Sequence, residues 1–333
     1  MGRGRRSRLQ SWKDAPVKAV HVVVVGAGAF GAWTAHHLRE RGAAVTLVEA
    51  QSPGHSRSSS GDETRILRCG YGPDRIYSEM AHLSLAQWRA LDARTGMGLW
   101  HPCGILWLAA GSDPYTDATR RTLQACGYRY DVLDRDALQR RFPELQVAGW
   151  DAGASRRTPD GGQIDTALLE TESGVILARR AVRALADDLA ARGVRLIHAV
   201  VRPPGDRLDA IEAGDGARIA GDRFVFTCGA WLPGLFPDLL GGRIRPTRQV
   251  VVYFGVPPGD ARFASPRWPA WIDFPSGIYG TPDIDGRGVK VGIDEHGPPL
   301  DPDTAERIAD GDSITRARAW LARRVPALAR APV

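Results

Sequence analysis

The chain has 333 residues, enough for two domains, and its 43% hydrophobic and 25% charged content is ordinary for a globular protein. Its formal net charge of +6 does not indicate nucleic-acid binding, because residues 1–18 carry six basic side chains and one acidic one, a net +5 that leaves +1 elsewhere. We expect this basic tail to be disordered, and the lack of an apolar run of roughly 18 residues excludes a membrane span.

Residues 20–50 predict a strand, a glycine-rich loop, a helix and a second strand. Four valines run directly into Gly-Ala-Gly-Ala-Phe-Gly, as a buried parallel strand feeding a helix does. In such a unit Gly26 makes the tight turn, Gly28 lets backbone N–H groups reach a pyrophosphate, and Gly31 lets the helix pack closely. The loop therefore predicts a dinucleotide site, whose expected contacts are Gly26, Gly28, Ala29, Phe30 and Gly31.

An acidic residue closes the second strand of this unit. Glu49 lies 18 residues after Gly31, where a carboxylate accepts hydrogen bonds from the ribose of an adenosine. A carboxylate at this position disfavours a 2′-phosphate, which leaves FAD or NAD as the cofactor and disfavours NADP.

The rest of the chain alternates between two kinds of sequence. Before residue 172 the pattern predicts a loop at 51–62, a helix at 64–91, a strand at 104–109, a helix at 120–141 and a turn at Gly161–Gly162. Nucleotide-binding sequence then recurs, with a helix at 180–192 and strands at 194–197 and 223–226. Strands at 249–254 and 288–292 belong to a second sheet.

We therefore expect an α/β fold with two interleaved domains. The nucleotide-binding domain is assigned to 19–102 and 172–244, and an α+β substrate and catalytic domain to 103–171 and 245–333. The four cysteines show neither a Cys-x-x-Cys pair nor metal-ligand spacing. They indicate reduced thiols in a cytoplasmic protein with no metal site.

Several short motifs, taken together, are specific to one group of flavoenzymes. They are His55–Arg68, Ser173–Val175, Cys228–Trp231, Arg248–Val251, Gly277–Gly280 and Gly288–Lys290. From about residue 20 to 330 the chain resembles the sarcosine oxidase-like amine oxidases of the D-amino-acid oxidase superfamily, a group with monomeric sarcosine oxidase, N-methyltryptophan oxidase and pipecolate oxidase. The resemblance implies FAD as the cofactor and a Rossmann-like FAD-binding domain interleaved with a mixed-sheet substrate domain.

Arg65 and Arg68 lie three residues apart at the start of the helix expected at 64–91, so they share one face. The resemblance implies that Arg65 packs near the flavin and that Arg68 binds the substrate carboxylate, which a planar guanidinium fits with two hydrogen bonds. On spacing alone, two surface arginines among 41 (44 basic residues less three lysines) remain an alternative. The resemblance also assigns Thr64, Gly229 and Trp231 to the cofactor site.

Lys290 stands out because the chain has only three lysines, and the other two are Lys13 and Lys18. It lies in an apolar strand, where a solvated charge is not expected; the alternative is an edge-strand lysine with a packed stem. The resemblance implies that it lies beside the flavin ring and promotes oxygen reduction by stabilising developing negative charge. It also implies that Tyr279 lines the substrate pocket, the alternative being a half-buried aromatic on a strand.

The chain departs from the pattern of this group in three places. Ser60 and Gly61 replace a histidine pair. Asp294 aligns with a pocket histidine, so either a more basic or hydroxylated substrate is favoured or the side chain points away. The group continues beyond the position of Val333 with a covalent flavin cysteine and a segment that closes over the FAD. We therefore expect a C-terminally truncated fragment that holds FAD without a covalent link.

The predicted function is oxidation of the C–N bond of a secondary amine, such as an N-methyl amino acid, with oxygen as acceptor and an imine and hydrogen peroxide as products. Its catalytic residues are Lys290, Arg68 and Tyr279. A flavin dehydrogenase that uses another electron acceptor, or an inactive truncated product, remain alternatives. The expected partners are a carboxylate-bearing amine and molecular oxygen, with no nucleic acid or membrane, and we expect a monomer.

Overall fold

The structure is a computed structural model that describes residues 19–109, 113–147, 166–205 and 208–333. The chain divides into two compact units. The first unit consists of residues 1–58 and 185–243, and the second consists of residues 59–184 and 244–333. The turn expected at Gly161–Gly162 and the basic tail at 1–18 lie outside the described residues.

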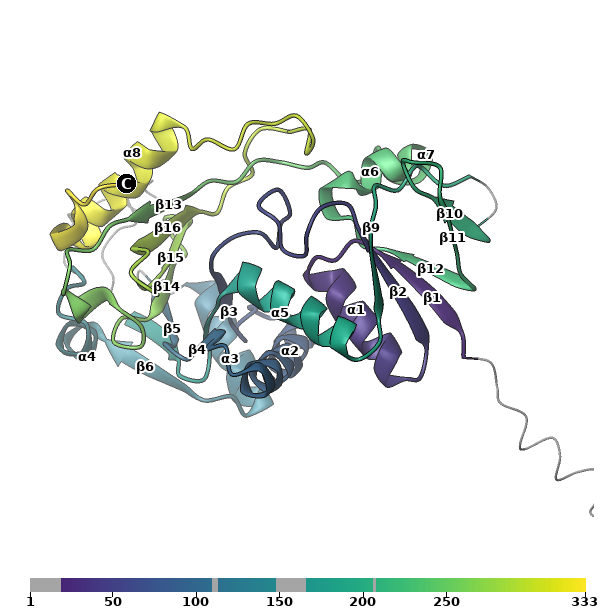
Figure 1. Cartoon of the computed structure of the whole chain (residues 1–333). Helices are drawn as coiled ribbons and strands as arrows, with labels where there is room; N and C mark the ends of the chain where they lie inside the picture. The colour runs from purple at the N-terminus through teal and green to yellow at the C-terminus, as the bar shows by residue number, and fades with distance from the viewer. Residues whose placement is uncertain (1–18, 110–112, 148–165, 206–207) are drawn as a thin grey trace, which may run out of the picture. The chain divides into compact units, whose positions relative to one another are not determined.

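The first unit contains a parallel sheet with the strand order β12-β1-β2-β9 (Figure 1). Its first three elements are β1 (His21–Val25), α1 (Ala29–Glu40) and β2 (Ala44–Glu49), followed later in the chain by β9 (Arg195–His198) and β12 (Arg223–Phe226). The four valines of β1 are buried, as expected for a central strand of a parallel sheet. The strand–helix–strand prediction for 20–50 and the strands predicted at 194–197 and 223–226 are confirmed.

Short elements complete the first unit. The hairpin β10 (Ala210–Glu212) and β11 (Arg218–Ala220) lies between β9 and β12 in the chain. The helical turns η1 (Gly229–Trp231), α6 (Leu232–Leu235) and α7 (Pro237–Leu240) follow β12. The predicted helix at 180–192 is confirmed as α5 (Ala178–Ala191), which begins in the second unit and ends in the first.

The second unit is built on a seven-stranded mixed sheet with the order β13-β16-β15-β14-β5-β7-β6. The strands are β5 (Ile105–Ala109), β6 (Tyr130–Asp134), β7 (Thr166–Glu170), β13 (Val251–Phe254), β14 (Ala270–Asp273), β15 (Ile278–Thr281) and β16 (Val289–Ile293). Only the β14–β5 pair is parallel among these strands as described. The strands predicted at 104–109, 249–254 and 288–292 are therefore present.

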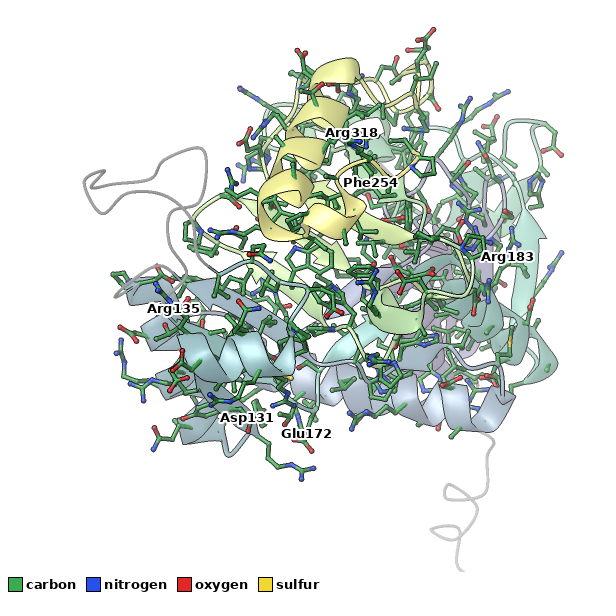
Figure 2. The ribbon with its side chains drawn as sticks, turned by 90° about the vertical axis from the view of Figure 1, so that its left-hand side faces the viewer. Asp131, Arg135, Glu172, Arg183, Phe254 and Arg318 are labelled. Atoms are coloured by element: carbon green, nitrogen blue, oxygen red, sulfur yellow. The ribbon has the colours of Figure 1, made fainter. Side chains whose placement is uncertain are left out.

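The two faces of this sheet have different roles. On one face, side chains such as Phe254, Val291 and Trp271 form a core with Trp320 of α8 (Gly311–Arg324). Arg318 of α8 also contacts this core, and Figure 2 labels it together with Phe254. Its guanidinium carbon lies 5.1 Å from the centre of the Phe254 ring. The strand register places a different set of residues on the opposite face: Tyr253, Lys290, Thr281, Tyr279, Ile272, Trp107 and Glu170.

A three-stranded antiparallel sheet, β3-β8-β4, corrects one sequence prediction. β3 (Arg65–Leu67) pairs with β8 (Gly174–Ile176), which in turn pairs with β4 (Trp100–His101). The helix predicted at 64–91 is therefore wrong at its start, because α2 spans Arg75–Thr95. Pairing with β8 overrides the apolar spacing, and Gly70, Gly72 and Pro73 separate the strand from the helix.

The polar helix predicted at 120–141 is also wrong in its middle. This segment contains the end of α3 (Pro114–Cys126), the edge strand β6 and the short helix α4 (Arg135–Arg141). Gly127 ends α3 in the left-handed conformation, and Asp134 caps α4 by accepting a hydrogen bond from the Ala137 N–H. The short helical turns η2 (Ala261–Phe263) and η3 (Pro326–Leu328) complete the second unit.

The compact units differ in extent from the domains expected from sequence. Segments 59–102 and 172–184, expected in the nucleotide-binding domain, contain β3, β4 and β8 and belong to the second unit. The second segment of the first unit ends at Arg243. None of the helices in the described part of the chain has the length and apolar character that a membrane crossing requires.

Candidate active site

The glycine-rich loop of the first unit has the tight geometry that its sequence predicts. Gly26 has φ +98°, and its N–H donates to the carbonyl of Val48 at 2.7 Å. A Cβ on Gly31 would lie 1.7 Å from the Gly26 carbonyl oxygen, so only glycine lets α1 start so close to β1. Gly28 precedes α1 with φ −71°, and Ala29 and Phe30 form the first helical turn, where Phe30 is 84% exposed.

Glu49 fixes this loop from the end of β2. Its carboxylate accepts hydrogen bonds from the Ala27 N–H at 2.7 Å and from the Gln51 N–H at 3.0 Å, and its side chain is buried. The imidazole of His55 lies 3.8 Å from the same carboxylate. A glycine cradle beside a carboxylate at the next strand end is the donor and acceptor set that an adenosine diphosphate group requires, so these residues fit an FAD nucleotide.

The end of β12 contributes a residue that the sequence reasoning missed. The Thr227 hydroxyl lies 2.9 Å from the Gly26 carbonyl oxygen, to which it donates, and 2.8 Å from that of Val25. Thr227 could have been inferred from the sequence because it directly follows the strand predicted at 223–226, which pairs with β1. Gly229 follows with φ +54°, and the Trp231 ring lies 6.0 Å from the ring of His55.

Lys290 is a buried cation of the second unit, with 1% of its surface exposed. Its Nζ donates to Asp62 Oδ2 at 2.5 Å and to the carbonyl of Thr64 at 2.8 Å. Burial lowers the pKa of Lys290 to about 8, although the Asp62 carboxylate opposes this change. The edge-strand alternative therefore does not hold, since β16 is paired on both sides, with β13 and with β15.

Asp62 is the second residue that the sequence reasoning missed, because it fell at the end of a predicted loop. Besides Lys290, its carboxylate contacts the Arg65 guanidinium and accepts hydrogen bonds from the Tyr253 hydroxyl at 3.3 Å and the Glu63 N–H at 2.7 Å. Burial acts to raise the pKa of Asp62, but Lys290 and Arg65 outweigh it and hold this pKa below its usual value. The sequence contains one indication of such a residue, since a lysine within an apolar strand needs a buried carboxylate to pair with it.

A cavity of about 740 Å³ lies in the second unit. Of the residues predicted for the site, it brings together Arg65, Arg68 and Tyr279, and Asp294 also lines it, whereas the nearby residue His296 does not. The Tyr279 ring occupies the space above Gly292, where a Cβ would lie 2.4 Å from the ring. Tyr279 is thus both a half-buried aromatic residue on a strand and part of the cavity wall.

Arg68 is held by aromatic rings and not by the helix that the sequence suggested. Its guanidinium carbon lies 4.3 Å from the centre of the Tyr71 ring and 5.0 Å from that of Trp107, and Nη1 donates to the Gly70 carbonyl. Arg68 comes directly after β3, so its position relative to Arg65 follows from an extended chain and not from helical spacing.

Glu170 organises the segment that carries Arg68, and no local sequence pattern indicates this role. This buried carboxylate accepts hydrogen bonds from the N–H groups of Cys69 at 2.7 Å and Gly70 at 3.0 Å. It also accepts from Trp107 Nε1 at 2.8 Å and from the Ser173 hydroxyl at 2.5 Å. Four donors therefore satisfy one buried carboxylate and fix both the Arg68 segment and the Trp107 ring.

Thr64, expected near the cofactor, is buried directly before β3, against side chains on one face of the large sheet. Its hydroxyl lies 3.2 Å from the Tyr253 hydroxyl and 3.3 Å from that of Thr281, while its carbonyl binds Lys290. Burial raises the pKa values of Tyr253 and Tyr279, so both phenols stay neutral at physiological pH. Around Lys290 the structure thus gathers neutral hydroxyls, one carboxylate and one guanidinium.

Known proteins match this chain over almost its whole length. The family model described as FAD dependent oxidoreductase matches residues 21–333. Monomeric sarcosine oxidase from Bacillus sp. (strain B-0618) is 29% identical over 294 residues, which cover 86% of this chain and 71% of that protein. N-methyl-L-tryptophan oxidase from Yersinia pestis (strain Pestoides F) is 25% identical over 296 residues, covering 86% and 73%.

A solved structure extends the likeness to the fold. Fructosyl peptide oxidase from E. terrenum superposes with a TM-score of 0.73 at 20% identity, over 96% of this chain and 78% of that one. At this identity the match shows a shared fold and carries nothing about the substrate.

Proposed function

Because the chain belongs to the FAD dependent oxidoreductase family, we propose that it oxidises the C–N bond of a secondary amine that carries a carboxylate, with oxygen as electron acceptor. The observation that carries this proposal is the cavity of the second unit, which contains Arg68 as an anion-binding group and lies next to the buried ammonium of Lys290. The names of the two relatives, sarcosine oxidase and N-methyl-L-tryptophan oxidase, favour an N-methyl amino acid.

Residues of the first unit would hold the nucleotide part of FAD. These are the Gly26–Gly31 loop for the diphosphate, Glu49 for the ribose, and Gly229 with Trp231. Bound FAD would supply a two-electron acceptor for the hydride that leaves the carbon next to nitrogen; the resulting iminium would be hydrolysed by water, and the two electrons would pass to oxygen, which with two protons becomes hydrogen peroxide.

Arg68 binds and orients the substrate carboxylate. Its guanidinium stays charged at every physiological pH, and its planar fork fits both carboxylate oxygens at once. The rings of Tyr71 and Trp107 fix its plane before substrate arrives, so little side-chain freedom is lost on binding.

Lys290 stabilises negative charge that develops on oxygen. A buried ammonium acts with little screening by water, and its hydrogen bonds to Asp62 and Thr64 hold it in place before the reaction. Tyr279 lies against this cation, with its ring centre 5.9 Å from Nζ, and forms the wall of the cavity on that side.

The test is to purify the protein with FAD and to supply N-methyl amino acids and the matching N-methylamines without a carboxylate. We expect oxygen consumption and equimolar hydrogen peroxide with the amino acids and much slower turnover with the simple amines. Anaerobic bleaching of the flavin by amine, without peroxide in air, would replace the oxidase with a dehydrogenase. No bleaching by any secondary amine would overturn the substrate class.

We also infer a monomer in the cytoplasm. The first supporting point is the word monomeric in the name of a relative. The second is that all four cysteines are free thiols, as a reducing compartment would keep them. Light scattering after size-exclusion chromatography tests the assembly state, and a particle of twice the mass of the chain would contradict it.

A further inference from the structure

The buried ammonium of Lys290 faces few groups that can compensate its charge. The segment before β3 contributes the Asp62 carboxylate, and the first residue of β3 contributes the Arg65 guanidinium, a second positive charge. The neighbouring strands contribute the neutral phenols of Tyr253 and Tyr279. Asp62 is thus the one anion, among the groups packed on Lys290 in the described structure, that opposes both burial and the repulsion from Arg65.

The hydrogen bonds of the ammonium also depend on Asp62. An ammonium has three N–H donors, and here one goes to Asp62 Oδ2 at 2.5 Å and one to the Thr64 carbonyl at 2.8 Å. Among the described residues no third acceptor bonds to this ammonium, so one N–H remains without one. The Tyr253 hydroxyl, 3.3 Å from Oδ1, in turn fixes the carboxylate.

We propose that Asp62 is a positioning residue, whose carboxylate keeps Lys290 protonated and directs its remaining N–H to the oxygen that is being reduced. In that step oxygen gains two electrons from the reduced cofactor and two protons to become hydrogen peroxide, while Lys290 stabilises the charge and keeps its own proton. The oxygen part rests on the proposed function, whereas the coupling between Asp62 and Lys290 does not.

The coupling has a direct physical consequence. Burial already lowers the pKa of Lys290 to about 8 with the carboxylate in place. Removal of an opposite charge at hydrogen-bond distance lowers the pKa of an ammonium further, by about one to three pH units. Without Asp62, Lys290 would therefore lose its proton within the physiological range, because a buried charge without a counterion is costly.

The scarcity of lysine makes this measurable without any assay of activity. Lysine labelled with ¹⁵N at Nζ gives three side-chain signals in the whole chain, and Lys290→Arg identifies the one from β16. In the FAD-loaded protein we expect that signal to titrate near pH 8. In Asp62→Asn and Asp62→Ser it should titrate about one to three pH units lower, and Asp62→Glu should restore most of the difference.

Glu63→Gln is the matched control. This neighbouring carboxylate pairs with Arg179 and Arg287, each at 3.3 Å, and makes no ion pair with Lys290 in the described structure. Its removal should leave the titration of Lys290 unchanged. If both neutral replacements of Asp62 titrate as the parent protein does, or if Glu63→Gln shifts Lys290 equally, the proposal is overturned. Two neutral replacements are used so that a folding defect in one does not decide the result.

Stopped-flow reoxidation of the reduced enzyme tests the oxygen part. If the ammonium is needed, the rate falls as pH rises through the pKa of Lys290. A shift of about one to three pH units should therefore make Asp62→Asn about 3-fold to about 200-fold slower at pH 7.5, with recovery at lower pH. A pH-independent loss would indicate a structural defect and overturn positioning. A shifted Lys290 titration with an unchanged reoxidation profile would overturn the oxygen role of Lys290, and with it that part of the proposed function.

Discussion

Arg68 meets its surroundings through two aromatic faces and a single backbone carbonyl. Arg68→Lys keeps the charge but loses the planar fork and the stacking, so we expect KM for an N-methyl amino acid to rise about 10- to 100-fold. Steady-state kinetics with peroxide detection measures this change. Arg75→Lys, on the exposed start of α2, is the control and should leave KM as it is. Unchanged KM in Arg68→Lys would remove this residue from carboxylate binding.

Lys290 should affect the step with oxygen far more than the step with amine. In Lys290→Met we expect anaerobic flavin reduction to be retained and reoxidation to slow by roughly 10²-fold, the effect of losing one electrostatic stabiliser. This variant leaves the Asp62 carboxylate without its ammonium partner, which is itself destabilising. The double variant Lys290→Met/Asp62→Asn removes both charges. If it reoxidises at the parent rate, the effect of Lys290→Met was on stability alone.

The residues that the sequence identified share one property, which is a local signal. Gly26, Gly28 and Gly31 follow a strand of valines, and Lys290 interrupts another apolar strand. Asp62 and Glu170 have no such signal. Asp62 lies 228 residues from Lys290, and Glu170 lies about 100 residues from the Cys69 and Gly70 N–H groups that it binds. A carboxylate in a loop or at a strand end is ordinary until the fold shows which buried donors surround it.

At the scale of elements, α1 can start where it does because Gly31 has no side chain. A Cβ at this position would meet the backbone of Gly26 at 1.7 Å, and backbone cannot move aside as a flexible side chain does. We expect Gly31→Ala to lose most of its bound FAD at purification and to melt at a lower temperature. The matched control is Gly234→Ala in α6, where a Cβ has no atom within 4 Å. Normal flavin content in Gly31→Ala would show that the loop does not hold the cofactor.

The prediction of elements was good where a segment's own pattern decided its structure. The strands β1 and β2 and the apolar face of α5 are buried as the pattern of their sequences predicts. β3 was taken for a helix because three residues, Arg65–Leu67, carry too little periodicity to compete with the long pattern of α2. Its partner strand β8 lies more than 100 residues later, so pairing could not be read locally.

At the scale of the whole molecule, a ligand that binds the folded chain should stabilise it by mass action. Free FAD at 100 times its dissociation constant adds about 2.7 kcal/mol to the free energy of unfolding of the flavin-free protein. We expect Tm to rise by several degrees with added FAD when unfolding is followed by circular dichroism. Gly31→Ala should show a smaller rise at the same concentration. A Tm that FAD leaves unchanged would contradict binding to the native state.

The scarcity of lysine has a consequence for how the chain can be cut. A protease specific for lysine has three sites in 333 residues, two of them within the first 18 and the third at Lys290. That third bond lies in β16, hydrogen-bonded to β13 on one side and β15 on the other. Cleavage there requires the strand to leave the sheet, so the rate at which a fragment ending at Lys290 appears reports the opening of this part of the molecule. The rate of native digestion by such a protease therefore measures how often β16 separates from the sheet, because the chain has arginine at almost every other basic position.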